Sequence, residues 1–143
     1  MTTAYFETSA VLKLVLVEDG SDAAGALWDA ADPIVTSRIS YAEARAALAA
    51  ANRSGRLTAR ELSAAKLILQ ERLLELAHVE VTADIVQSGG DLAEGYGLRG
   101  YDAIHLASAL VLEAPELIMV TWDRDLARAS RRAGLNLAGI AHE

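Results

Sequence analysis

Short apolar runs alternate along the chain with longer segments in which apolar residues recur at helical spacing. The short runs predict strands of three to five residues at positions 4–6, 34–36, 79–81, 117–120 and 135–137. The longer segments predict helices at 10–17, 22–31, 40–51, 58–76, 103–112 and 124–133, with one more that begins at Thr82. Strands that alternate in this way with helices indicate an α/β fold with a short, mainly parallel central sheet flanked by helices.

Two of the predicted helices carry further signals. Thr58, with Glu61 three positions later, matches a capping box at the start of the longest helix. The leucines of that helix fall on one face, which either packs on the domain or forms a dimer surface. The helix at 103–112 is apolar nearly all round, so we expect it to be buried.

The length and composition describe an ordinary globular protein. With 143 residues, the chain suits one domain that spans positions 1–143. The absence of cysteine excludes disulfides, zinc–thiolate sites and thiol nucleophiles. No export signal or long apolar span is visible in the sequence, so we expect a cytoplasmic protein that does not enter a membrane.

The net charge of −7 argues against a protein that holds nucleic acid by bulk electrostatics. Bound divalent cations would cancel part of this charge where the acids gather. The position of the acids along the chain therefore matters more than their number.

Four acids lie where predicted strands end and helices begin. Glu7 directly follows the first strand, and Asp123 follows the strand at 117–120. Glu43 lies in the first turn of the helix after the second strand, and Asp102 lies at the start of the buried helix. Ligands of parallel α/β sheets bind beyond the carboxyl ends of the strands. We therefore expect these four carboxylates to converge on one edge of the sheet.

Each acid also has a purely structural interpretation. Ser40 and Glu43 match a capping box, Asp102 and Asp123 suit N-cap positions, and Glu7 can be a surface residue. As a set they are harder to explain, because two carboxylates roughly 4 Å apart repel by about 4 kcal/mol at an effective dielectric near 20. A hard cation such as Mg²⁺ or Mn²⁺ would relieve this repulsion. Such a metal can activate water and neutralise the charge that develops on a phosphate.

The segments that carry these acids resemble a known family. FETSAVLKL, SYAEARAAL, GLRGYDAIHLASAL and VTWDRDLARASRRAGL are similar, in this order, to the four acidic segments of PIN domains. They are particularly similar to those of the VapC toxins of bacterial toxin–antitoxin pairs. Together the four segments reach from the first predicted strand to the last predicted helix.

The resemblance implies a Mg²⁺- or Mn²⁺-dependent endoribonuclease that hydrolyses RNA phosphodiester bonds with metal-activated water. It also implies a VapB-like antitoxin as partner and a homodimer. The residues that match the catalytic and metal-binding positions are Glu7, Glu43, Asp102 and Asp123. The supporting residues that match hydroxyl positions are Thr8, Ser9 and Thr121, and Asp125 is an extra acid at the rim.

Glu7 departs from the family pattern, which has Asp at this position. Its side chain is longer by one carbon–carbon bond, about 1.5 Å. A misplacement of about 1 Å can cost around 10²-fold in rate. Glu7 therefore either binds metal with a shifted geometry or weakens catalysis. The alternative function is a weakened or inactive PIN domain that acts as an antitoxin- or RNA-binding module.

An arginine, two histidines and two other possible functions also have to be considered. Arg99 lies beside Asp102 and is the candidate for a substrate contact. We expect His105 to be a hydrogen-bonded core residue without a catalytic role, and His142 has no partner visible in the sequence. A phosphoacceptor domain would need a lysine at the end of a late strand, and the chain has none there. Action on DNA stays open, since contacts to 2′-hydroxyls cannot be read from the sequence.

Overall fold

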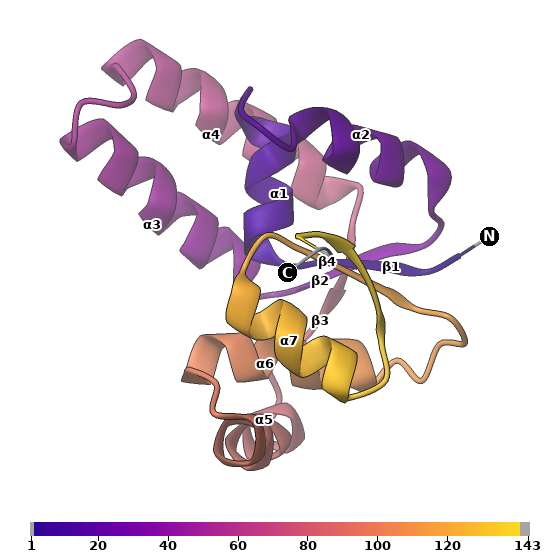
Figure 1. The fold of residues 1–143 in the computed structure, drawn as a ribbon. Helices are drawn as coiled ribbons and strands as arrows, with labels where there is room; N and C mark the ends of the chain where they lie inside the picture. Colours follow the sequence, from indigo (N-terminus) through magenta and orange to yellow (C-terminus); the bar gives the residue numbers. More distant parts are fainter. Residues whose placement is uncertain (1, 141–143) are drawn as a thin grey trace.

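A five-stranded parallel sheet forms the centre of the protein in the computed structural model, which describes residues 2–140 (Figure 1). The strands are β1 (Ala4–Phe6), β2 (Ile34–Ser37), β3 (Ala77–Val79), β4 (Ile118–Thr121) and β5 (Asn136–Gly139). Their order across the sheet is β3-β2-β1-β4-β5. The chain moves outward from β1 to β3 and then crosses back to β4, so the order reverses between β1 and β4. This reversal is the topological switch point at which parallel sheets bind ligands.

Helices cover both faces of this sheet (Figure 1). They are α1 (Thr8–Val15), α2 (Ser21–Ala30), α3 (Ser40–Arg53), α4 (Ala59–Leu74), α5 (Ala83–Tyr96), α6 (Gly100–Leu110) and α7 (Arg124–Arg132). Helices α1 to α4 pack on one face and α5 to α7 on the other. Within residues 2–140, no helix is long and apolar enough to cross a membrane.

The central strand β1 contributes to the cores on both sides. Ala4 and Phe6 are buried among α1, α3 and α4, whereas Tyr5 between them is buried among α6 and α7. Successive side chains of a strand point to opposite faces, so a central strand covered on both faces is apolar throughout. The end of β1 is thereby fixed at the switch point.

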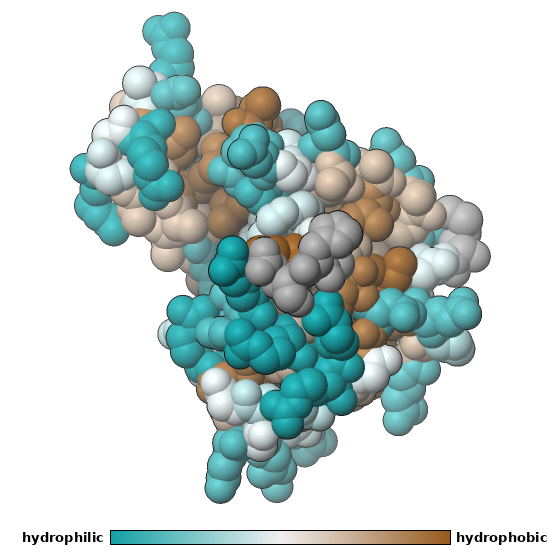
Figure 2. All heavy atoms as spheres, in the orientation of Figure 1, coloured by the Kyte–Doolittle hydropathy of each residue, from teal (hydrophilic) through white to brown (hydrophobic). Residues whose placement is uncertain are grey.

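On the second face, α7 packs directly on β4 and β5 and is strongly amphipathic. Leu126, Ala127 and Ala129 are buried against the sheet side, whereas Arg124 and Arg128 are exposed. Figure 2 shows hydrophilic residues gathered over the outward side of this helix. Burial of one face fixes the helix, and with it the position of its first residue.

The predicted α/β fold with a mainly parallel sheet is confirmed, and every strand pair in the described part of the chain is parallel. The capping box of Thr58 and Glu61 is present. The leucine face of α4 packs into the domain, because Leu69 and Leu73 are buried in the core between the sheet and helices α1 to α4.

Several predicted boundaries, including both ends of α1 and the end of α3, are wrong by two or three residues. Helix α4 ends at Leu74 instead of position 76, and β3 accordingly lies at Ala77–Val79, two residues earlier than predicted. Helix α6 begins at Gly100 instead of position 103, and this shift places Asp102 inside the helix.

A glycine holds the edge strand β5 against the end of β4. Gly139 has a φ of +97°, and a Cβ there would overlap the backbone carbonyl oxygen of Thr121. We predict that Gly139→Ala lowers the free energy of unfolding by about 2–4 kcal/mol, through strain and overpacking. Gly95→Ala, inside α5 with open space around its Cα, should instead stabilise by roughly 0.5–1 kcal/mol. Chemical denaturation measures both, and an unchanged midpoint for Gly139→Ala would contradict the prediction.

Candidate active site

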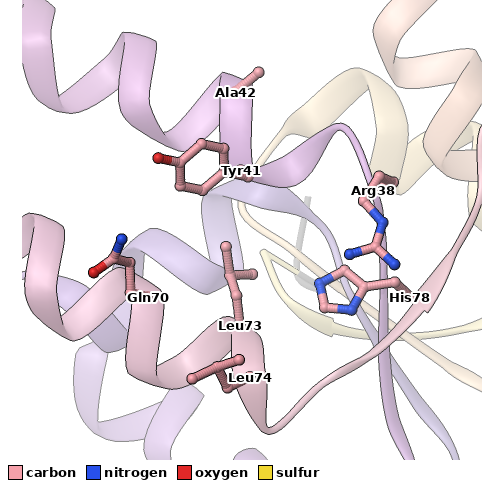
Figure 3. A pocket seen from close by; sticks show the side chains of 7 residues that line it. All are labelled: Arg38, Tyr41, Ala42, Gln70, Leu73, Leu74 and His78. Atoms are coloured by element: carbon pink, nitrogen blue, oxygen red, sulfur yellow. The ribbon is translucent and has the colours of Figure 1, made fainter.

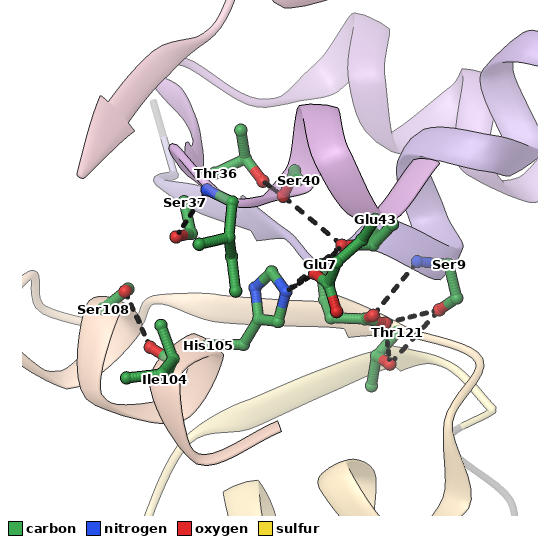
Figure 4. A network of polar contacts seen from close by, with 12 residues as sticks. Glu7, Ser9, Thr36, Ser37, Ser40, Glu43, Ile104, His105, Ser108 and Thr121 are labelled. Carbon is green, nitrogen blue, oxygen red and sulfur yellow. Dashed lines mark hydrogen bonds and ion pairs between the residues drawn. The ribbon is translucent and has the colours of Figure 1, made fainter. Parts of the chain in front are cut away.

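Glu7 lies at the switch point, between the end of β1 and the start of α1. Its Oε2 accepts a hydrogen bond from the backbone N–H of Ser9 at 3.1 Å and so caps α1. Its Oε1 accepts from the hydroxyls of Ser9 at 2.5 Å and Thr121 at 2.6 Å (Figure 4). Only 6% of Glu7 is exposed. Residues of α1 and β4 therefore satisfy this buried carboxylate from two sides.

Glu43 does not form the predicted capping box. The N-cap of α3 is Ile39, which makes no side-chain cap bond. The hydroxyl of Ser40 lies 2.6 Å from that of Thr36 in the buried interior instead. A bond to a residue four positions earlier, at the end of β2, has thus replaced the capping pattern. The side chain of Glu43 is directed to the same edge as Glu7 (Figure 4).

Two donors meet on one oxygen of Glu43. Its Oε1 accepts from the hydroxyl of Thr8 at 2.6 Å and from Nε2 of His105 at 2.6 Å. Burial raises the pKa of Glu43, but the hydrogen bonds and charge of His105, the bond from Thr8 and the charge of Arg99 outweigh this effect. The net result is a pKa below the ordinary range, so Glu43 is ionised at neutral pH.

Asp102 and Asp123 form a second pair of acids, which a guanidinium bridges. Asp123 is the N-cap of α7, as predicted, and its Oδ1 accepts from the N–H of Leu126 at 2.9 Å. Asp102 is not an N-cap, because α6 already begins at Gly100. Arg99 donates from Nε to Asp102 at 3.0 Å and from Nη2 to Asp123 at 2.9 Å.

The ion pair with Arg99 does not fully offset the effects that raise the pKa of Asp102. Burial, and after it the charge of Asp123, raises the pKa of Asp102, and the bond and charge of Arg99 only partly oppose this. The side chain of Asp102 is 10% exposed, whereas that of Arg99 is 72% exposed. Two carboxylates are therefore held together by a guanidinium whose side chain lies largely in water.

The donor chemistry of this edge suits a hard divalent cation. All four acids supply oxygen atoms, and a positive group already lies between two of them. Among residues 2–140, however, no three acidic or histidine side chains are grouped as a ready metal site. Asp125 is exposed and pairs with Arg128 at 3.3 Å. In this structure Arg99 occupies the space between Asp102 and Asp123.

Comparison with known proteins identifies the fold. The family model for the PIN domain matches residues 4–132. The chain belongs to the PIN-domain family. Within it, this chain is 44% identical over 138 residues to Ribonuclease VapC45 and to Ribonuclease VapC49, both of Mycobacterium tuberculosis, with 96% of each chain covered. It therefore belongs with the VapC ribonucleases.

Solved structures share the fold of this PIN domain. PAE2754 of Pyrobaculum aerophilum matches with a TM-score of 0.72 and 21% identity, over 95% of this chain and 90% of that one. VapC20 of Mycobacterium tuberculosis, a sarcin–ricin loop cleaving toxin, matches with 0.68 and 20%, over 92% and 95%. VapBC2 of Rickettsia felis, bound to a DNA fragment from its promoter, matches with 0.64 and 18%, over 96% and 98%.

The sequence did not indicate that His105 and Tyr5 contact the acidic edge of the PIN domain. His105 is fully buried and hydrogen-bonded, as expected, but it also contacts Glu43 directly. The hydroxyl of Tyr5 lies 2.7 Å from Nδ1 of His105. Burial raises the pKa of Tyr5 well above its usual range, and the charges of Glu7 and Glu43 add to this. The sequence offers one signal, a histidine three residues after Asp102 on a buried helix. His142 lies outside the described residues.

The acidic edge is distinct from a hollow on another part of this PIN domain. That hollow, of about 730 Å³, lies among α3, α4 and β3 (Figure 3). Arg38, Tyr41, Leu73 and His78 are among the side chains around it, and none of the four acids is. The cavity is therefore not the candidate active site.

The raised pKa of Asp102 predicts how stability depends on pH. Because this pKa is higher in the fold than in the unfolded chain, ionised Asp102 costs stability above it, and the cost disappears as the pH falls through it. Asp102→Asn removes the charge, while its amide oxygen still accepts from Arg99, whose side chain is 72% exposed and whose ion pair therefore contributes little. We predict a Tm about 1–3 °C above that of the unmodified protein at pH 7, with the gap closing at acid pH.

Thermal unfolding followed by circular dichroism at several pH values tests this. Asp91→Asn makes the same chemical change at an exposed position of α5 and should give no such gap. A Tm for Asp102→Asn at or below that of the unmodified protein at pH 7 would refute the interpretation.

Proposed function

We propose that this PIN domain is a metal-dependent endoribonuclease, the toxin of a VapBC-type toxin–antitoxin pair. The supporting observation is that acids from four distant segments gather at the switch point of a chain 44% identical to two ribonucleases. The names of these relatives do not favour the alternative of an inactive binding module. RNA is the proposed substrate, and hydrolysis of its phosphodiester bonds is the proposed reaction.

In this proposal Glu7, Glu43, Asp102 and Asp123 hold Mg²⁺ or Mn²⁺, directly or through water. When bound, such a metal polarises the phosphate and lowers the pKa of a coordinated water. The protein contributes the orientation of the carboxylates. The hydroxyls of Thr8, Ser9 and Thr121 supply it, since each donates to a carboxylate oxygen of Glu7 or Glu43 at 2.5–2.6 Å.

Arg99 is the proposed substrate contact. Its side chain is 72% exposed, and the residue lies directly before α6, so the guanidinium can leave the aspartates when a cation takes its place. Released from them, its planar fork suits an RNA phosphate close to the acids. Asp125, exposed in the first turn of α7, would lie at the rim of the same site.

The proposed partners are a VapB-like antitoxin and a second copy of the chain. One structure with the same fold is that of VapBC2 from Rickettsia felis, bound to a fragment of its promoter DNA. In this chain, Asp102 and Asp123 already accept a guanidinium, so a basic side chain of an antitoxin could block the site in the same way. We place the protein in the cytoplasm, where its proposed RNA substrate is found.

We predict that the purified protein cuts cellular RNA into discrete fragments in Mg²⁺ or Mn²⁺ and that EDTA abolishes cutting. Asp102→Asn should lower the rate by on the order of 100-fold or more, because a metal-binding carboxylate becomes a neutral amide. Gel electrophoresis of the cleaved RNA measures the rate. Asp91→Asn is the matched control and should cut normally. Cutting that persists in EDTA, or in Asp102→Asn, would contradict the proposal.

The longer side chain of Glu7 leads to a separate prediction. Glu7→Asp should raise the nuclease rate, because the carboxylate then retracts by about 1.5 Å to the position of the family aspartate. The same RNA assay, run at equal protein concentration, measures the change. Asp123→Glu, the reverse change at a neighbouring acid, should lower the rate. An unchanged or lower rate for Glu7→Asp would contradict this prediction.

A further inference from the structure

Two fully buried polar side chains lie against the acids but have no part in the chemistry proposed above. His105 comes from α6 and Tyr5 from β1, and both are 0% exposed. Their rings meet edge to face, with centroids 5.8 Å apart. A buried imidazole or phenol costs free energy unless it is hydrogen-bonded, so the partners of these groups are specific features of the fold.

Both ring nitrogens of His105 are engaged. Nε2 lies 2.6 Å from Oε1 of Glu43, and Nδ1 lies 2.7 Å from the hydroxyl of Tyr5. An ionised carboxylate can only accept, so Nε2 carries a hydrogen whether the ring is neutral or charged. Nδ1 and the hydroxyl of Tyr5 then share the second hydrogen bond. The ring of His105 is therefore fixed at both ends and cannot flip without breaking a buried bond.

The contact restricts Glu43 in turn. Oε1 accepts from both His105 and Thr8, which lie on α6 and α1. The side chain of Glu43 is 26% exposed, whereas its partner His105 is completely buried. The buried donors thus hold one oxygen of Glu43, and Oε2 is left to accept a ligand at the open edge.

We infer that His105 is a positioning residue that fixes Glu43 in the orientation in which it receives a divalent cation, and that Tyr5 fixes the ring of His105. This inference rests on the proposed function, because it concerns the cation proposed there. Partners that orient a metal-binding side chain commonly contribute 10–100-fold to metal affinity or activity. His105 acts through Glu43 and touches neither substrate nor metal.

Calorimetric titration of EDTA-stripped protein with Mn²⁺ tests the inference. His105→Leu should weaken Mn²⁺ binding by about 10–100-fold. His105→Gln, which keeps an N–H donor near the position of Nε2, should recover most of this loss. Tyr5→Phe removes only the phenolic oxygen and should weaken binding about threefold, the effect expected for one neutral hydrogen bond.

A structural control separates positioning from general loss of stability. Leu106→Ala removes a fully buried side chain from the same helix and destabilises the fold, but it removes no polar group from the network. It should bind Mn²⁺ as tightly as the unmodified protein. Equal weakening in Leu106→Ala and His105→Leu, or normal binding by His105→Leu, would overturn the inference. Should His105→Leu fail to fold, Tyr5→Phe decides, and unchanged Mn²⁺ affinity in that variant overturns the inference.

Failure of the proposed function would look different, because the unmodified protein would then neither bind Mn²⁺ nor cut RNA. In that case ¹⁵N-edited NMR of the metal-free protein tests whether the His105 ring is held in place by its hydrogen bonds. We expect a hydrogen on Nε2 that exchanges slowly with water and exchanges faster in Tyr5→Phe. A ring without a hydrogen on Nε2, or one whose Nε2 hydrogen exchanges freely in the unmodified protein, would overturn the inference.

Discussion

Repulsion between carboxylates at the sheet edge, seen where Asp123 raises the pKa of the already buried Asp102, is the constraint on which the rest of this edge depends. The switch point brings Glu7 and Asp123 to neighbouring strands, and α3 and α6 add Glu43 and Asp102. At a separation of about 4 Å, each pair of charges would cost about 4 kcal/mol at an effective dielectric near 20. Net stabilities of about 5–15 kcal/mol cannot absorb several such costs. Each acid therefore needs donors, and the polar groups around the edge are arranged to supply them.

The two halves of the edge meet this need by different means. On one half, short hydroxyl side chains and a buried imidazole donate to Glu7 and Glu43 at 2.5–2.6 Å. These donors are held by the packed core and have little freedom to leave. On the other half, the exposed guanidinium of Arg99 bridges Asp102 and Asp123, and exposed ion pairs contribute little net stability. The edge thus combines a rigid half with a half whose cation can be exchanged.

The sequence predicts the parts of this arrangement that follow from periodicity and topology. Apolar runs locate the strands, and parallel order then brings the acids that follow them to one edge. The local capping pattern of Ser40 and Glu43 failed because the hydroxyl of Ser40 pairs with Thr36 in the interior. His105 pairs with Glu43 across 62 positions, and Tyr5 pairs with His105 across 100. Such partners are chosen by the packing of α6 on the sheet, which no local pattern encodes.

Glu7 shows how stability and ligand binding compete for a single carboxylate. Its oxygens accept three hydrogen bonds, two from Ser9 and one from Thr121. The bond to the backbone N–H of Ser9 caps α1, and caps of this kind stabilise by about 0.5–2 kcal/mol. An oxygen that serves a cation must give up part of this donor set. The acid that departs from the family pattern is thus tied to the fold by donors from both α1 and β4.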